Sequence, residues 1–173
     1  MFLKPTDILS YLPLSAGHKV GDFGAGNGAY ADALLEKLGR EGAVYAFDFF
    51  SPHVEAMHRS RVARQRDNLF SLCVDLNSHL PLKDALLHCS LLVNTLHALR
   101  ERTRFLSELN RVMRPGGRVL MADWAASFNG MGPTNEAAVT PGEAVRLFKA
   151  TGFRVGDMLP AGTHHYAFIA EKL

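Results

Sequence analysis

The chain alternates between short apolar runs and segments with the periodicity of amphipathic helices. The apolar runs have the length of buried strands and cover residues 20–23, 43–47, 69–74, about 90–93 and 119–122. Between the first two runs, Ala33, Leu34 and Leu38 share one face of a predicted helix over residues 29–38. This alternation predicts an α/β fold in which a mostly parallel sheet carries helices on both faces.

Capping residues predict where two further helices begin. Ser51 is expected as an N-cap, with Pro52 in the first helical position. Thr140 and Glu143 form a capping-box pattern, and Gly152 is expected to end the helix that follows them.

An amphipathic helix is also predicted before the fifth strand. Phe105, Leu109, Val112 and Met113 are spaced to face inward, and the turn residues Arg114-Pro115-Gly116-Gly117 should end this helix. The remaining predicted elements are a short helix over residues 6–12 and strands over 153–159 and 166–171.

The first strand leads into a glycine-rich turn with the pattern Asp22-x-Gly24-x-Gly26-x-Gly28. Glycine allows a positive φ and lets a ligand approach the backbone closely. The predicted helix that follows offers free N–H groups and a partial positive charge at its N-terminus, which suit a carboxylate or a phosphate. A strand, a glycine turn and a helix in this order predict a site for a nucleotide-like ligand.

The glycine spacing and the neighbouring acid narrow the choice of ligand. In the dinucleotide fingerprint G-x-G-x-x-G, the third glycine stands one position later than Gly28, where this chain has Ala29. Asp22 would repel a pyrophosphate but could accept a hydrogen bond from an ammonium group. The pattern therefore favours a ligand that carries both an amine and a carboxylate.

Polar side chains follow the next three strands, namely Asp48, Asp75 and Asn94. Asp48 stands about 20 residues past the last glycine, where nucleotide-binding folds place an acid on the ribose hydroxyls. In a parallel α/β sheet the ligand lies beyond the carboxyl ends of the strands. These side chains should therefore converge with Asp22.

With these residues and with Arg114-Pro115-Gly116-Gly117, the chain resembles the class I S-adenosylmethionine-dependent methyltransferases. The likeness covers nearly the whole chain and is greatest to the small-molecule methyltransferases that include the ubiquinone/menaquinone group. It implies a Rossmann-like fold with a seven-stranded sheet whose last strand is antiparallel. It also implies S-adenosyl-L-methionine as cofactor and S-adenosyl-L-homocysteine as product.

The resemblance assigns roles to individual residues. Asp48 would bind the two ribose hydroxyls, Asp75 would accept from the adenine amino group, and the Leu76 N–H would reach a ring nitrogen. Phe49 would pack on the adenine face. The implied cofactor-binding residues are Asp22, Gly24, Ala25, Gly26, Gly28, Asp48, Phe49, Asp75, Leu76 and Asn94.

Several of these assignments have a structural alternative. The glycine pattern could be a tight turn only. Asp48 could be a solvated strand end, and Asp75 could shape a turn ahead of Asn77 and Ser78. Phe49 could be an ordinary core residue.

His97 is the candidate catalytic residue for methyl transfer by in-line displacement. It follows the fourth strand, beside the expected position of the transferred methyl group, and an imidazole there could take a proton from the acceptor. A thiol, a phenol or an acidic carbon would leave little for such a base to do, whereas an amine or an alcohol could need it. A purely structural histidine is the alternative.

Composition fits a single enzyme domain over residues 1–173, with residues 1–14 as a helix or lid. The net charge of +2 gives no strong attraction to acidic polymers. The apolar runs are shorter than the ~20 residues needed to cross a bilayer. Cys73 and Cys89 are too few for a disulfide framework, so a cytoplasmic location is expected. Because no paired metal-ligand spacing is present, we expect no metal site.

A small molecule is the expected acceptor. The basic segment 58–66 is interpreted as a solvated helix face, with RNA or an anionic lipid as the weaker option. Nucleic-acid methylation is disfavoured because Asn94-Thr95-Leu96-His97 follows the fourth strand, in place of an Asn-Pro-Pro-Tyr-like run. The alternatives that the sequence leaves open are a non-catalytic S-adenosylmethionine-binding module, an rRNA or protein methyltransferase, and a nicotinamide-dependent oxidoreductase. It also leaves open a homodimer.

Overall fold

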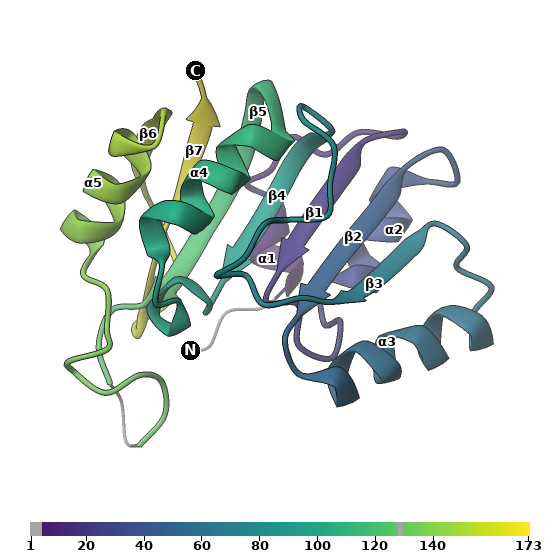
Figure 1. Cartoon of the computed structure of the whole chain (residues 1–173), viewed down its shortest axis with the longest axis horizontal. Coiled ribbons are helices and arrows are strands. Elements are labelled where there is room, and N and C mark those ends of the chain that lie inside the picture. The colour runs from purple at the N-terminus through teal and green to yellow at the C-terminus, as the bar shows by residue number, and fades with distance from the viewer. Residues whose placement is uncertain (1–4, 128–129) are drawn as a thin grey trace.

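The computed structural model describes residues 5–127 and 130–173 (Figure 1). The strands are β1 (Lys19–Phe23), β2 (Ala43–Asp48), β3 (Leu69–Cys73), β4 (Leu87–Val93), β5 (Met113–Trp124), β6 (Phe153–Leu159) and β7 (His165–Lys172). The helices are α1 (Pro5–Leu9), α2 (Ala31–Leu38), α3 (Ser51–Ala63), α4 (Arg102–Val112) and α5 (Pro141–Ala150), with a short 3₁₀ helix, η1 (Leu96–Ala98).

All seven strands belong to one sheet in the order β3-β2-β1-β4-β5-β7-β6. The first five strands pair in parallel, and β7 runs antiparallel to both of its neighbours, β5 and β6. The predicted seven-stranded sheet with an antiparallel last strand is therefore confirmed. The strand order reverses between β1 and β4, and ligands bind at such switch points, beyond the carboxyl ends of the strands.

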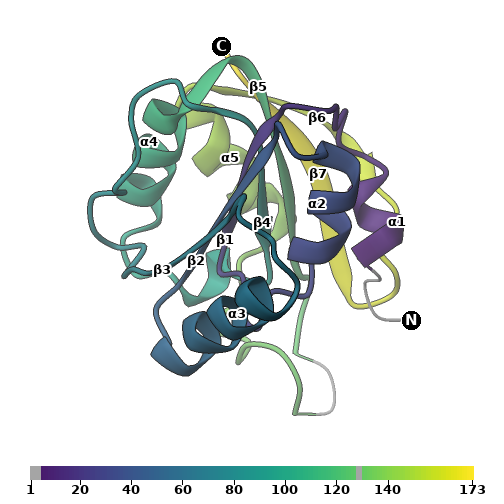
Figure 2. The same cartoon turned by 90° about the vertical axis from the view of Figure 1, so that its right-hand side faces the viewer.

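Both faces of the sheet are covered by helices, which explains why the strands read as continuous apolar runs. α4 and α5 lie on one face, and α1, α2 and α3 lie on the other (Figure 2). Neighbouring strand residues alternate between two cores: Leu92 packs with Phe105 of α4, and Leu91 packs with Leu34 of α2. All four side chains are fully buried.

The connection from β3 to β4, residues 74–86, is a loop held against α4. Arg111 donates from Nη1 to the Leu82 carbonyl over 2.8 Å and from Nη2 to the Leu80 carbonyl over 3.0 Å. Glu108 accepts both from Arg111 and from the Leu80 N–H, at 2.9 and 3.0 Å. One helix turn of α4 thus fixes a loop that contains two of the predicted cofactor residues.

The end of α4 differs from the prediction. The helix stops at Val112, and Met113 begins β5 instead of facing inward from the helix. Met113 pairs with Leu87, and pairing resumes only at Arg118, so residues 114–117 are accommodated opposite a single β4 residue. Met113 is buried in either setting, so its hydrophobicity could not distinguish a last helical residue from a first strand residue.

One predicted helix cap is confirmed and one is wrong. Thr140 Oγ1 accepts the Glu143 N–H over 3.2 Å at the start of α5. Ser51 is already helical, and Phe50 is the N-cap of α3. The reason lies in Asp48, whose Oδ1 accepts the Phe50 N–H over 2.9 Å and turns the chain one residue earlier.

The N-terminal segment packs onto the face that carries α2. α1 is shorter than the predicted helix over 6–12, and Ile8, Leu9 and Leu12 are buried in the same core as α2. Tyr11 Oη donates to the Pro160 carbonyl over 3.1 Å. Residues 1–4 of the predicted lid lie outside the described residues. No helix in the described part of the chain has the length and hydropathy to cross a bilayer.

Candidate active site

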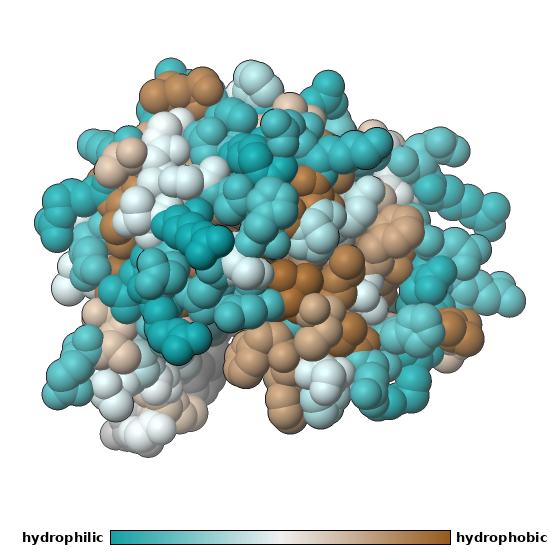
Figure 3. All heavy atoms as spheres, viewed as in Figure 1, coloured by the Kyte–Doolittle hydropathy of each residue, from teal (hydrophilic) through white to brown (hydrophobic). Residues whose placement is uncertain are grey.

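A cavity of about 520 Å³ opens at the carboxyl ends of the parallel strands. Six of the predicted cofactor residues line it, namely Gly24, Asp48, Phe49, Asp75, Leu76 and Asn94. The sequence prediction missed seven further lining residues, namely Cys73, Val74, Asn77, Thr95, Ala98, Leu99 and Arg100. Their place next to Asp75 and Asn94 in the sequence was the available signal. Apolar residues reach the surface in this part of the molecule, below and beside β3 (Figure 3).

Gly24 and Gly26 have different reasons to be glycine. At Gly24, φ is +80°, and an added Cβ would overlap the Thr95 side chain. Gly24 and Ala25 both donate their N–H to the Phe47 carbonyl, at 2.8 and 2.9 Å. At Gly26, φ is +56°, yet an added Cβ would meet open space. Packing therefore leaves room beside Gly26 for a ligand.

Gly28 serves packing between helices. Its φ is +84°, and an added Cβ would come within 2.9 Å of Met57 Cγ on α3. Gly28 and Ala25 do not line the 520 Å³ cavity. The structure thus gives Gly28 a clear structural role, and its predicted contact with the cofactor stays a prediction.

Asp48 joins the glycine turn to the end of β2. Its Oδ2 accepts the Gly26 N–H over 2.8 Å and its Oδ1 accepts the Phe50 N–H over 2.9 Å, while His53 Nδ1 lies 3.4 Å from Oδ1. The residue is only 7% exposed, so the solvated-strand-end alternative is wrong. A carboxylate has about four acceptor positions, which leaves capacity for ribose hydroxyls.

Asp22 is a buried acid with an unused oxygen. It is 2% exposed, and its Oδ2 has no hydrogen-bond partner among the described residues. Burial, and then the charge of Asp48, raise the pKa of Asp22 to about 7. A buried carboxylate is unfavourable unless a donor or a cation satisfies it. The ammonium group of S-adenosylmethionine provides such a donor, so the residue fits this cofactor.

Asp75 and Asn77 line the same cavity as Asp48. Asp75 Oδ1 accepts from the backbone N–H and the side-chain amide of Asn77, at 2.9 and 2.8 Å, and these bonds lower the pKa of Asp75. Asn77 Oδ1 in turn accepts the N–H groups of Arg100 and Glu101, both at 3.0 Å. The turn-forming alternative for Asp75 is thus confirmed. Both bonds to Asn77 use Oδ1, so Oδ2 can still accept from an adenine amino group.

The aromatic candidate Phe49 projects from the end of β2. Its side chain is 77% exposed, so the core alternative is wrong, and the ring lines the cavity. Asn94 directly follows β4 with a φ of +53°, and its N–H donates to the Ala122 carbonyl over 2.9 Å. A cavity lined by an exposed aromatic ring and by polar groups suits a flat, polar base such as adenine.

His97 lies in η1 and does not line this cavity. Its Nδ1 lies 2.6 Å from Oδ1 of Asp123, near the end of β5, and its backbone N–H donates to Oδ2 over 3.0 Å. Asp123 is fully buried, whereas the His97 side chain is 18% exposed. The sequence prediction missed Asp123, although an acid at the end of an apolar strand was a signal of the same kind as Asp48.

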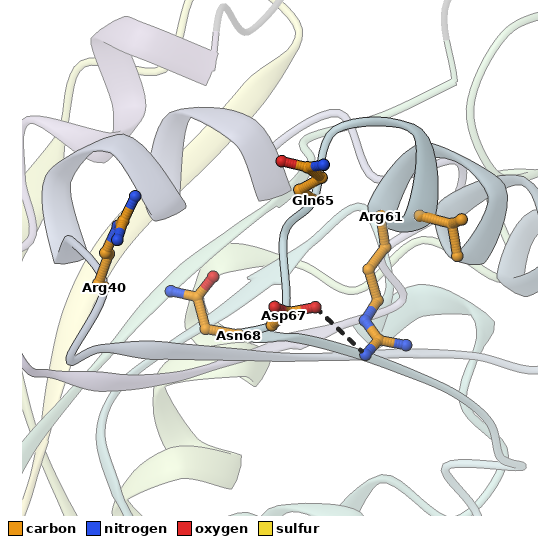
Figure 4. Close-up of a pocket in the computed structure, with 6 residues that line it drawn as sticks. Arg40, Arg61, Gln65, Asp67 and Asn68 are labelled. Carbon is orange, nitrogen blue, oxygen red and sulfur yellow. Dashed lines mark ion pairs between the residues drawn. The ribbon is translucent and has the colours of Figure 1, made fainter.

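A larger cavity of about 630 Å³ lies elsewhere, at the residues that precede β2 and β3 (Figure 4). Arg40, Arg61, Gln65, Asp67 and Asn68 line it, and Arg61 lies 4.0 Å from Asp67. This cavity opens near the amino ends of the strands, away from the glycine turn. Volume alone is therefore a poor guide here, and the position at the carboxyl ends of the strands identifies the 520 Å³ cavity as the candidate site.

The comparison with protein families decides the class of the chain. A family model described as a methyltransferase domain matches residues 21–121, which is more than half of the chain. The chain belongs to this methyltransferase-domain family. The matched segment runs from the glycine turn through β5 and so contains the residues described above.

Solved structures of other proteins share the fold of this methyltransferase domain. A SAM-dependent methyltransferase from Aquifex aeolicus is similar with a TM-score of 0.90 and 27% identity, over 99% of this chain and 91% of that chain. The family match and this structure identify S-adenosylmethionine as the cofactor. The [4+2]-cyclase SpnF has a TM-score of 0.84 at 15% identity, over 97% of this chain and 80% of that chain, which shows a shared fold alone.

Curated relatives are similar over only part of their length. A demethylmenaquinone methyltransferase from Tropheryma whipplei (strain Twist) is 30% identical over 114 residues, 66% of this chain and 45% of that protein. An uncharacterized 37.1 kDa protein in transposon TN4556 of Streptomyces fradiae is 30% identical over 121 residues, 68% of this chain and 34% of that protein. The methyltransferase domain thus spans less than half the length of either relative.

Proposed function

We propose that residues 1–173 act as one methyltransferase domain that transfers a methyl group from S-adenosylmethionine to a small-molecule acceptor by in-line displacement. The observation that carries this proposal is the convergence of Asp22, Gly26 and Asp48 at one end of the sheet. Space is open beside Gly26, and an unpaired carboxylate oxygen lies on Asp22. This combination matches the amine, carboxylate and ribose of one cofactor molecule.

Different residues in and beside the cavity would bind different parts of the cofactor. Asp48 would accept from the ribose hydroxyls, and Asp22 would accept from the ammonium group. Phe49 would pack on adenine, while Asp75 Oδ2 and the Leu76 N–H would bind its polar edge. The backbone N–H groups that donate to Asp48 and Asp75 hold these carboxylates in fixed positions before a ligand arrives.

The cofactor supplies a methyl group that its sulfonium already activates. The work left to the protein is to hold the acceptor in line with that group and to remove a proton where the acceptor carries one. Alignment of two bound reactants can account for ~7–11 kcal/mol of a barrier. The exposed edge of His97, next to the switch point, provides the candidate base.

The proposal is tested by two measurements on the purified chain. Calorimetric titration with S-adenosylmethionine and, separately, with NADH tests the cofactor, and binding of NADH alone would contradict the proposal. A screen of small phenols, alcohols, amines and thiols with a methyl-labelled donor tests the reaction, with label transfer to one class as the expected result. Binding of the cofactor with transfer only to RNA or protein would refute the small-molecule acceptor.

A further inference from the structure

We infer that Asp123 is the positioning residue that holds His97 with Nε2 free of hydrogen and turned away from the sheet. The inference deepens the proposed function, because it states how this histidine is prepared to accept a proton. Asp123 itself would touch neither cofactor nor acceptor and would act only through the imidazole.

Three donors converge on the Asp123 carboxylate. Oδ1 accepts from His97 Nδ1 at 2.6 Å and from the Trp124 N–H at 2.8 Å, and Oδ2 accepts the His97 N–H at 3.0 Å. The two contacts from His97 hold both its backbone and its ring, so η1 and the imidazole are fixed to the same side chain. A fully buried carboxylate with three donors is a rigid support for the ring.

These contacts decide which ring nitrogen carries hydrogen. A carboxylate whose oxygens accept backbone N–H groups is an acceptor, so Nδ1 must be the donor in the 2.6 Å contact. A neutral imidazole has only one N–H, and Nε2 is then left with its lone pair. Such a nitrogen can take a proton from an acceptor hydroxyl, and the ring can later release that proton to water.

The groups that surround the pair leave this assignment intact. Arg102 on α4 donates to the His97 carbonyl at 3.3 Å and pairs with Glu143 on α5 at 3.2 Å, so a carboxylate balances its charge. Tyr166 on β7 stands opposite Asp123 in the sheet, and burial, together with Asp123, raises the pKa of its hydroxyl. Burial is the main reason why the pKa of His165, the residue before Tyr166 on β7, is lowered. Tyr166 therefore stays protonated, and His165 adds little positive charge.

The central test reads the tautomer of His97 by long-range ¹H–¹⁵N NMR on the full chain with labelled histidine, above the pH at which imidazoles protonate. His97→Gln assigns the signal among the eight histidines. The wild-type chain should show hydrogen on Nδ1 and a bare Nε2. Hydrogen on Nε2 in the wild type would overturn the inference.

Asp123→Ala provides the comparison. It removes the acceptor of the Nδ1–H group, so no hydrogen bond then holds the hydrogen on Nδ1. The His97 signal should shift toward the Nε2–H tautomer, while Asp157→Ala, at an exposed position on β6, should leave it unchanged. An unchanged tautomer in a folded Asp123→Ala chain would refute the role of Asp123.

A second pair of variants covers the case in which Asp123→Ala does not fold. In His97→Asn the side-chain amide can replace Nδ1–H as donor to Asp123, whereas the longer His97→Gln side chain replaces Nε2 better. We expect a higher midpoint of thermal unfolding for His97→Asn than for His97→Gln, and the reverse order would contradict the inference. None of these readouts depends on the cofactor, so failure of the proposed function would be seen separately in the titration with S-adenosylmethionine.

Discussion

At the scale of the residue, Gly24 and Gly26 share a positive φ for different reasons. Gly24 is required by its neighbour Thr95, and Gly26 borders empty space, although both have a positive φ. A side chain added at Gly26 would enter the space left for a ligand, whereas one added at Gly24 would first collide with Thr95. Gly26 is therefore the sharper probe of the cofactor site.

We predict that Gly26→Val abolishes measurable binding of S-adenosylmethionine while the chain stays folded, because the side chain would fill the ligand's space. Gly116→Val is the matched control, since Gly116 also has a positive φ, of +71°, and open space around its missing Cβ, but lies in the irregular first part of β5, near the amino ends of the other parallel strands. Both variants should lose similar stability from backbone strain. Isothermal titration with near wild-type affinity for Gly26→Val would remove the proposed site.

Asp22 predicts a pH dependence of cofactor binding. Its pKa of about 7 in the free chain means that it is largely protonated below neutral pH, whereas a bound ammonium favours the ionised form. Binding must then release a proton, and affinity should rise by up to about tenfold per pH unit as the pH increases toward 7, then level off. Titrations between about pH 5.5 and 8.5 should show this slope in the wild type, and Asp22→Asn should lose it.

The raised pKa of Asp22 also predicts that the stability of the cofactor-free chain falls as the pH rises, whereas the affinity for the cofactor rises. A carboxyl whose folded pKa exceeds its unfolded value of 3.8 binds more protons in the folded state. Its contribution therefore favours folding at low pH and is lost as the pH rises through about 7. Asp22→Asn should consequently be stabilising relative to the wild type at pH 8 in the absence of cofactor, and a destabilising effect there would show that the burial penalty is relieved by other groups.

At the scale of the element, α4 determines the position of the loop that carries Asp75. Arg111 reaches two carbonyls of residues 74–86 and the carboxylates of Glu108 and Asp84, and the pair formed with Glu108 lowers the pKa of that carboxyl to about 2. An element far from the cavity in sequence thus supports one of its walls.

We predict that Arg111→Ala lowers the free energy of unfolding by ~1–3 kcal/mol, the range for hydrogen bonds that involve a charged group, and also weakens cofactor binding because the loop is released. Arg118→Ala is the control: this arginine pairs with Glu171 at 3.4 Å on an exposed strand position, away from the loop. Urea unfolding and calorimetric titration measure the two effects. An Arg111→Ala chain with lower stability and unchanged affinity would mean that the loop position is set by other contacts.

At the scale of the whole molecule, the cofactor site and the catalytic histidine that we propose lie at different parts of the sheet edge. The 520 Å³ cavity is built from the ends of β1 to β4, whereas His97 is held by β5 through Asp123. On this proposal, cofactor binding and proton transfer can be altered separately, although both depend on the same sheet.

We predict that His97→Ala leaves the dissociation constant of S-adenosylmethionine within about threefold of the wild type, because the side chain lies outside the cavity, and lowers the rate of label transfer by ~10²–10⁴, the range for loss of a general base. For an identified acceptor, the wild-type rate should fall toward acidic pH as the imidazole is protonated, and the variant should lack this fall. Full turnover by His97→Ala would assign the histidine to packing and leave alignment as the whole mechanism.

Local sequence patterns were enough to predict the fold and part of the candidate site. The apolar runs, the glycine turn and the acids after the strands are visible in the sequence, because the position of a residue at the end of a parallel strand follows from the hydrophobic period. For that reason the strands and the convergence of Asp48, Asp75 and Asn94 at one cavity were predictable. The N-cap of α3 and the end of α4 were not, since a hydrogen bond from Asp48 and a register shift against β4 decided them.

What the sequence determined by itself is therefore the fold family and the residues at the carboxyl ends of the strands that line the candidate cofactor cavity, because the place of each of these residues follows from its own strand. Only the tertiary structure decided the rest. It brought Nδ1 of His97 to within 2.6 Å of Oδ1 of Asp123 and placed Gly28 against Met57 of α3. It also made Asn77 bind both Asp75 and the backbone at Arg100. These relations join side chains from different elements, and no local pattern specifies them, because they arise when the order of strands in the sheet places distant segments side by side.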